Sequence, residues 1–269
     1  MNLKFFKDFL KYKKYQYLTF KKYNFKYNKN PSTENYINQL KKNGYVVIKN
    51  YFSIENCQKI RRIIDNFIQL SPEMTSSDKL GSDIRIHGAE NISKEMRELV
   101  DEKINFTQKI GEQYTNQEIG LYMMMANRTM FIKSNLGSGQ GWHKDSYSKQ
   151  FKSILYLSDI DENNGPLQII KKSNSNLFML DLFLKLKNKF PSNRFLDDEI
   201  LNTLKIKEDQ IIELKDLTGT LILFDTSYIH RGKPLKKNMR YALTNYFYPK
   251  KIFSDHENHF QPMLKKIIN

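Results

Sequence analysis

Short runs of alternating apolar and polar residues fill the C-terminal half of the chain, and alternation with a period of two is typical of β-strands. An earlier run of the same kind begins at Gly44. The pair Asn164-Gly165 separates two of the later runs and is a common turn sequence. We predict strands at 44–48, 121–133, 151–157, 166–170, 218–224 and 240–248.

In the first half of the chain, apolar residues recur every three to four positions, which places them on one face of an α-helix. Ser53 suits the N-cap of the longest early helix, because its hydroxyl can accept a hydrogen bond from an N–H of the first turn. We predict helices at 34–42, 53–71 and 92–110, packed on the outside of a sheet, with residues 73–91 as a loop.

Helices that precede a cluster of short strands favour a mainly β fold with flanking helices, and we predict a double-stranded β-helix, a jelly-roll or cupin-like barrel. The Asn30-Pro31 pair marks the boundary between an extension, residues 1–30, and one domain, residues 31–269. Residues 177–216 interrupt the strands, with an expected helix near 177–189 and a break at Pro191. We predict that this insertion forms a lid over one end of the barrel.

The formal net charge of +15 is concentrated at the N-terminus, where residues 1–30 contain nine lysines and one acidic residue, Asp8. Aromatic residues lie between these lysines, a composition that suits an anionic lipid surface or nucleic acid. Lys and Asn are abundant throughout the chain, however, so our first interpretation is a composition bias in a loosely packed tail. Peripheral membrane contact is the second, and we expect no nucleic-acid partner.

Cys57 is the only cysteine, which excludes an intramolecular disulfide and a cysteine-based zinc site. A single cysteine is typical of proteins in a reducing compartment, so we expect a cytoplasmic location. No stretch approaches the roughly 20 apolar residues that span a bilayer. The N-terminus also lacks the uninterrupted apolar segment of a signal peptide.

The motif Trp142-His143-Lys144-Asp145 begins what we interpret as an inward-facing strand. Alternation directs His143 and Asp145 to one face and Lys144 to the other. One imidazole and one carboxylate are two of the three ligands in the 2-His-1-carboxylate site of non-haem Fe(II) oxygenases. His230 follows the apolar run 221–224 and is our candidate for the third ligand. Such a set leaves metal positions open for catalysis, whereas a closed four-ligand site would be structural.

Arg240 begins the strand predicted at 240–248. Alternation places it on the same face as Ala242 and Thr244, which we assign to the barrel interior. A buried guanidinium needs an anionic partner, and its fork can bind a carboxylate through two hydrogen bonds. A dicarboxylate co-substrate is one candidate for that partner, and a protein carboxylate at the barrel rim is the other.

These motifs resemble those of the phytanoyl-CoA dioxygenase family of Fe(II)- and 2-oxoglutarate-dependent oxygenases, and the similarity extends over residues 40–249. In the family, the segment similar to 159–170 continues with Pro-Gly-Ser-His, whereas this chain has Lys171-Lys172-Ser173-Asn174. We expect this loop to affect the shape of the substrate site more than the iron. The resemblance is carried by Gly44-Tyr45-Val46-Val47-Ile48, Trp142-His143-Lys144-Asp145-Ser146, residues 157–170, His230-Arg231-Gly232 and Arg240.

The resemblance implies that His143, Asp145 and His230 hold Fe(II) and are the catalytic residues, and that Arg240 binds the distal carboxylate of 2-oxoglutarate. It further implies hydroxylation of an unactivated C–H bond of a small organic substrate by dioxygen, with release of succinate and carbon dioxide. The presence of Asp145 argues against the related halogenases, in which a small residue replaces the carboxylate.

Other side chains are expected to border the same pocket. Asn127 and Thr129, on the strand at 121–133, are candidate contacts to 2-oxoglutarate. Candidate substrate contacts are Arg85, His87, Tyr147 and Ser227.

Two alternatives from other functional classes stay open. One is a metal-dependent cupin-type isomerase or epimerase that uses the same barrel without 2-oxoglutarate. The other is a non-catalytic binding module that keeps the barrel.

Overall fold

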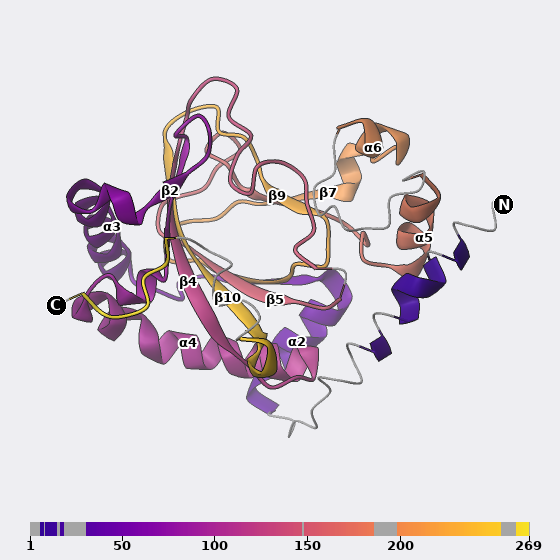
Figure 1. Cartoon of the computed structure of the whole chain (residues 1–269), viewed down its shortest axis with the longest axis horizontal. Helices are drawn as coiled ribbons and strands as arrows, with labels where there is room; N and C mark the ends of the chain where they lie inside the picture. The colour runs from indigo at the N-terminus through magenta and orange to yellow at the C-terminus, as the bar shows by residue number, and fades with distance from the viewer. Residues whose placement is uncertain are drawn as a thin grey trace.

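Two antiparallel sheets form the centre of the molecule (Figure 1). The computed structural model of the chain describes residues 6–7, 9–14, 17–18, 31–146, 148–185, 198–253 and 262–268. The larger sheet has the strand order β1-β8-β5-β10-β4-β3-β2, and the smaller sheet has the order β7-β6-β9. The strands of the larger sheet are β1 (Tyr45–Ile48), β2 (Ser76–Ser77), β3 (Asp83–His87), β4 (Ile119–Met130), β5 (Phe151–Tyr156), β8 (Leu221–Asp225) and β10 (Met239–Pro249), and those of the smaller sheet are β6 (Leu167–Ile170), β7 (Ile211–Leu214) and β9 (His230–Gly232).

Every strand predicted from the alternating pattern is present, but the expectation that residues 73–91 form a loop is wrong. This segment contains β2 and β3, and β3 pairs along its whole length with β4. Asp83 and Arg85 of β3 pair with each other through an ion pair at 2.6 Å. β3 turns these charged side chains inward while Ile86 packs in the core with the helices, so the segment does alternate, but over only five residues and with its polar face inward.

Three helices cover the outer face of the larger sheet. They are α2 (Pro31–Asn43), α3 (Ile54–Leu70) and α4 (Lys94–Thr115). Ser53 caps α3 as predicted, since its hydroxyl accepts a hydrogen bond from the Asn56 N–H at 3.1 Å. Buried side chains of these helices form one apolar core with the outward residues of the strands, among them Leu155, Leu223 and Leu243.

A second apolar cluster lies between the two sheets. Ile222 and Phe224 of β8 extend inward from the larger sheet, and Ile169 of β6 and Leu214 of β7 meet them from the smaller one. Two sheets that pack face to face in this way, with helices outside the larger one, confirm the predicted mainly β, jelly-roll architecture with flanking helices.

The insertion predicted at 177–216 is only partly separate from the sheets. Its end contains β7, which pairs with β6 and belongs to the smaller sheet. The remaining described parts are α5 (Asn176–Lys185), α6 (Asp198–Thr203) and the short 3-10 turn before β7, and α5 and α6 lie together at the end of the molecule opposite α3 (Figure 1). The break predicted at Pro191 lies outside the described residues, and the lid role stays a prediction.

The described part of the N-terminal extension packs against α5. Tyr12 is buried, and its ring centroid lies 5.2 Å from that of Phe183. The cluster also includes Trp142 and Ile229, which directly precede the two candidate histidine ligands in sequence. This part of the extension therefore borders the segments that carry the site.

Within the described ranges, we find no helix that combines the length and the apolar character needed to cross a bilayer. Cys57 is buried in α3. The cytoplasmic location stays a prediction.

We expect Ile60→Ala to lower the free energy of unfolding by about 2–5 kcal/mol, because it removes a fully buried side chain from the core under α3. Urea denaturation monitored by circular dichroism measures this loss. Ile54→Ala in the same helix is the matched control, since Ile54 is 63% exposed. Equal losses in the two variants would show that α3 does not pack on the sheet through the face described.

Candidate metal centre

His143 and His230 are joined by their backbones. The N–H of His143 donates to the carbonyl of His230 at 3.0 Å, and the N–H of His230 donates to the carbonyl of His143 at 2.9 Å. His143 makes a single bridge to the end of the smaller sheet and does not begin a regular strand, so that prediction is wrong in detail. Positive φ angles at Gly139 and Gly141 keep the preceding segment irregular.

The two imidazole rings are oriented by similar short-range contacts. Nδ1 of His143 lies 2.8 Å from the carbonyl oxygen of Gly141, and Nδ1 of His230 lies 2.9 Å from that of Tyr228. A carbonyl can only accept a hydrogen bond, so each Nδ1 carries the proton and each Nε2 has a lone pair for a metal. Burial, together with the neighbouring His230, lowers the pKa of His143 to about 3, which keeps this ring neutral.

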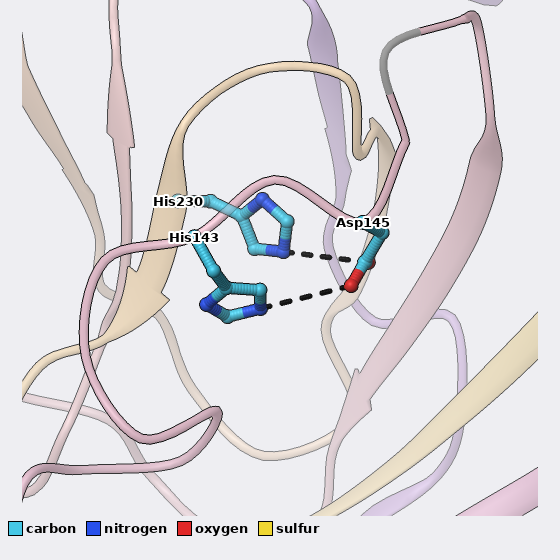
Figure 2. Close-up of side chains that lie close together, drawn as sticks. All are labelled: His143, Asp145 and His230. Atoms are coloured by element: carbon cyan, nitrogen blue, oxygen red, sulfur yellow. Dashed lines mark ion pairs between the residues drawn. The ribbon is translucent and has the colours of Figure 1, made fainter. Parts of the chain in front are cut away.

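The carboxylate of Asp145 faces both Nε2 atoms (Figure 2). Oδ1 lies 3.7 Å from Nε2 of His143, and Oδ2 lies 3.6 Å from Nε2 of His230. One ligand atom from each of the three residues lies within 4.8 Å of the others. Two imidazoles and one carboxylate match the donor set expected for Fe(II), and the residues therefore fit such an ion.

Asp145 is ionised although its side chain is only 8% exposed. Burial alone would raise the pKa of Asp145, but the ammonium group of Lys152 outweighs that effect and holds the pKa well below its usual value. Nζ of Lys152 lies 2.6 Å from Oδ2 of Asp145. The candidate site residues predicted from the sequence do not include Lys152. Alternation along the strand predicted at 151–157 is a signal that could have placed its side chain inward.

Lys144, between the two ligands in sequence, points away from them as predicted. It is buried, and its Nζ donates to the carbonyl oxygens of Ser173 at 3.0 Å and of Ser227. Burial lowers the pKa of Lys144 to about 7. This side chain thus links the segment that carries His143 to the turn that precedes His230.

Arg240 lies on the inner face of the larger sheet, as alternation predicted, and lines one pocket with the three candidate ligands. It is 5% exposed, and it donates to the carbonyl oxygen of Gly165. Its buried Nε has no hydrogen-bond partner. Among the described residues no carboxylate forms an ion pair with Arg240, so the protein carboxylate considered above is not found there.

The structure separates the remaining candidates. Asn127 and Arg85 line the pocket, but Arg85 is paired with Asp83. Thr129 is not among the described residues that line it, because its hydroxyl donates to Asp83 at 3.1 Å. The side chain of Asn127 also donates to Asp83, at 3.1 Å.

The other substrate candidates are not brought to the pocket among the described residues. His87 is buried beside Met263, and burial lowers its pKa to about 4. Ser227 is buried, and its carbonyl oxygen accepts from Lys144. Tyr147 lies outside the described residues. The sequence reasoning missed other residues of the pocket wall, including Ser138, Gly139, Lys152, Tyr156 and Tyr246.

We expect Gly139→Ala to weaken Fe(II) binding by at least about tenfold, the scale seen when groups that orient a metal ligand are changed. A methyl group on Gly139 would lie 2.5 Å from Cε1 of His143, so the imidazole would have to move. Gly141→Ala is the control, since its φ is similarly positive but its methyl group meets no atom within 4 Å. Calorimetric titration with Fe(II) under nitrogen measures both, and equal affinities would contradict the orientation described for His143.

Several solved enzyme structures share this fold. The epimerase SnoN of nogalamycin biosynthesis has a TM-score of 0.59 at 11% identity, with 81% of this chain and 82% of SnoN covered. EctD from S. alaskensis, solved with 2-oxoglutarate and 5-hydroxyectoine, has a TM-score of 0.58 at 15% identity, covering 85% and 80%. A prolyl hydroxylase from Trichoplax adhaerens has a TM-score of 0.55 at 17% identity, covering 83% and 91%. At these identities the likeness establishes the fold.

The sequence comparison establishes the family. A search among curated proteins gave no match. The family model for phytanoyl-CoA dioxygenase (PhyH) matches residues 40–238, a range that contains His143, Asp145 and His230 and ends just before Arg240. The match confirms the predicted resemblance over most of the chain, and the chain belongs to the phytanoyl-CoA dioxygenase family.

Proposed function

We propose that the protein is an Fe(II)- and 2-oxoglutarate-dependent dioxygenase that hydroxylates a C–H bond of a small organic substrate. The observation that carries this proposal is one pocket lined by His143, Asp145 and His230 together with Arg240, whose guanidinium has no carboxylate partner among the described residues. A metal set with open positions can accept a chelating co-substrate, and a buried arginine needs an anion. 2-Oxoglutarate meets both needs.

Each side chain of the pocket has a separate role. His143, Asp145 and His230 would hold Fe(II), which, when bound with 2-oxoglutarate, supplies the oxidising chemistry. Arg240 would fix the distal carboxylate, aided by the low dielectric of its surroundings. Tyr156 is buried, lines the same pocket and stands directly opposite Ala242 of β10. Such walls orient the bound molecules and exclude bulk water from the site.

The structural neighbours share this fold but are described as enzymes with different reactions. EctD has been solved with a hydroxylated product, whereas SnoN is described as an epimerase and the related SnoK as a carbocyclase. SnoN has also been solved with Fe³⁺ and α-ketoglutarate. A 2-oxoglutarate-dependent epimerase is therefore the second candidate. Hydroxylation and epimerisation share the site described and differ in whether oxygen enters the product.

Anaerobic titration of the apo-protein with Fe(II) and then 2-oxoglutarate tests the proposal. We expect a weak visible charge-transfer band in the wild type and none in His143→Ala. Arg240→Ala should need at least about tenfold more 2-oxoglutarate, because a charge-assisted bidentate contact contributes roughly 1.5–3 kcal/mol.

Arg128→Ala is the matched control, since Arg128 lies on the neighbouring strand and pairs with Asp65 on the outer side of the sheet. If iron binds but no concentration of 2-oxoglutarate produces the band, the co-substrate assignment is wrong. A cupin-type isomerase without 2-oxoglutarate would then be the better description. Failure of the wild type to bind iron would instead favour a non-catalytic binding module.

We propose that the N-terminal extension makes peripheral contact with the surface of an anionic membrane. Phe6 is 43% exposed and Leu10 is 50% exposed, and Leu177 of the adjoining α5 is 82% exposed. Lys7 and Lys11 are exposed beside these apolar side chains. Apolar residues that alternate with lysines suit an anionic bilayer, because insertion and charge attraction add. The same lysines would repel one another across a contact between two copies of the chain.

We expect the full chain to sediment with vesicles of phosphatidylglycerol and phosphatidylcholine and not with phosphatidylcholine alone. Leu10→Glu should weaken that binding by roughly tenfold, the effect of keeping one leucine side chain from an apolar environment. Leu70→Glu is the control, since Leu70 is 80% exposed at the end of α3. Equal binding of wild type and Leu10→Glu, or binding of neither, would contradict the proposed contact.

A further inference from the structure

Lys152 occupies the inner face of β5, inside the candidate metal pocket. It pairs across the sheet with Tyr246 of β10 and with Phe224 of β8. Its side chain is 6% exposed and lines the pocket with the three candidate ligands. A lysine in such a place requires a reason, because burying an ammonium group is costly unless it is paired.

Two contacts hold the ammonium group in place. Nζ lies 2.6 Å from Oδ2 of Asp145 and 3.6 Å from the centroid of the Tyr246 ring. The ring face attracts the cation and the carboxylate binds it directly, so the two contacts fix Nζ on one side of Asp145. The ion pair is therefore a defined part of the pocket.

This arrangement makes the two oxygens of Asp145 unequal. Both oxygens face a histidine, Oδ1 at 3.7 Å from Nε2 of His143 and Oδ2 at 3.6 Å from Nε2 of His230, but the ion pair with Lys152, at 2.6 Å, is made by Oδ2. A carboxylate can bind a metal through one oxygen or through both, and binding through both takes a second coordination position. A site that must also accept a chelating co-substrate and dioxygen needs three positions left open.

We propose that Lys152 is a positioning residue that occupies Oδ2 of Asp145, so that Asp145 binds the metal through Oδ1 alone. The inference rests on the proposed function. Lys152 would keep the third open coordination position of the metal available for the co-substrate and dioxygen. Lys152 also places a positive charge near the metal. This charge alone therefore weakens metal binding. The benefit of Lys152 is a higher affinity for 2-oxoglutarate.

The test compares two affinities in each variant. Calorimetry with Co(II) alone measures metal binding, and anaerobic titration of the Fe(II) protein measures 2-oxoglutarate binding from the charge-transfer band. In Lys152→Met we expect metal binding no weaker than in the wild type and 2-oxoglutarate binding about tenfold weaker, the scale of changes next to a metal ligand. A lysine that only supported folding would lower both affinities together.

Lys152→Gln separates the hydrogen bond from the charge. Its amide N–H can still donate to Oδ2, so we expect it to recover most of the 2-oxoglutarate affinity that Lys152→Met loses. Lys149→Met is the matched control, because Lys149 is an exposed lysine on the same segment that also lies over an aromatic ring, at 4.8 Å from the centroid of Tyr114. It should leave both affinities unchanged.

Three outcomes would overturn the inference: unchanged 2-oxoglutarate binding in Lys152→Met, parallel loss of metal and 2-oxoglutarate, or a Lys152→Gln variant that behaves like Lys152→Met. If Lys152→Met does not fold, Tyr246→Leu decides, since it loosens the ammonium group while it keeps every charge. It should show the same separation of affinities to a smaller degree. A wild type that binds metal but gives no band would contradict the proposed function itself, whereas a normal wild type with any of the three outcomes leaves that function standing.

Discussion

The candidate metal centre depends on the reciprocal backbone hydrogen bonds between His143 and His230. They join a segment that precedes β5 to a strand of the smaller sheet, so two ligands from distant parts of the chain share one register. Each ring then needs only a local carbonyl to set its orientation. The relative positions of the two histidines are thus fixed by backbone hydrogen bonds, and a local carbonyl oxygen orients each ring.

Asp145, the third candidate ligand, is supported from the opposite side of the larger sheet. The Asp145 N–H donates to the carbonyl of Thr226 at 3.1 Å. The adjacent Asp225 is fully buried, and its carboxylate accepts from the N–H of Ser227 at 2.9 Å and from the hydroxyl of Tyr114 at 2.7 Å. Tyr114 belongs to α4, so the outer helix stabilises the turn that accepts the hydrogen bond from Asp145 and leads to His230.

Charge explains why this pocket suits anions. Arg85, Lys152 and Arg240 all line it, while Asp145 is the only carboxylate among the described lining residues. Arg85 is neutralised by Asp83, and Lys152 is paired with Asp145, which leaves Arg240 as the cation that a ligand must satisfy. Because charges interact strongly where water is excluded, the pocket would favour a doubly charged co-substrate over a neutral one.

Periodicity predicted the parts of this arrangement that depend on neighbouring residues. The face of Arg240 and the strands themselves follow from alternation along a strand. Lys144 also points away from its two neighbours, although its segment forms only a single bridge. Thr129 has the predicted orientation but a different partner, because Asp83 from another strand takes its hydroxyl. That contact depends on the pairing of β3 with β4, which no local pattern in 73–91 indicates. For Lys152, alternation along β5 predicts that the side chain points inward. The carboxylate of Asp145, which stabilises the buried ammonium group, lies outside this strand and cannot be predicted from it.

Non-local contacts also stabilise the segment in which this chain departs from its family. Ser173 stands in the Lys171-Lys172-Ser173-Asn174 sequence and is fully buried. Its hydroxyl accepts from the N–H of Ile229 at 2.7 Å, and its carbonyl oxygen accepts from Nζ of Lys144 at 3.0 Å. Ser173 therefore contacts a neighbour of each histidine ligand without reaching the pocket. These contacts stabilise the two segments that carry the candidate ligands, because backbone groups and a buried lysine beside the site must be paired. The effect of this loop on the shape of the substrate site stays a prediction.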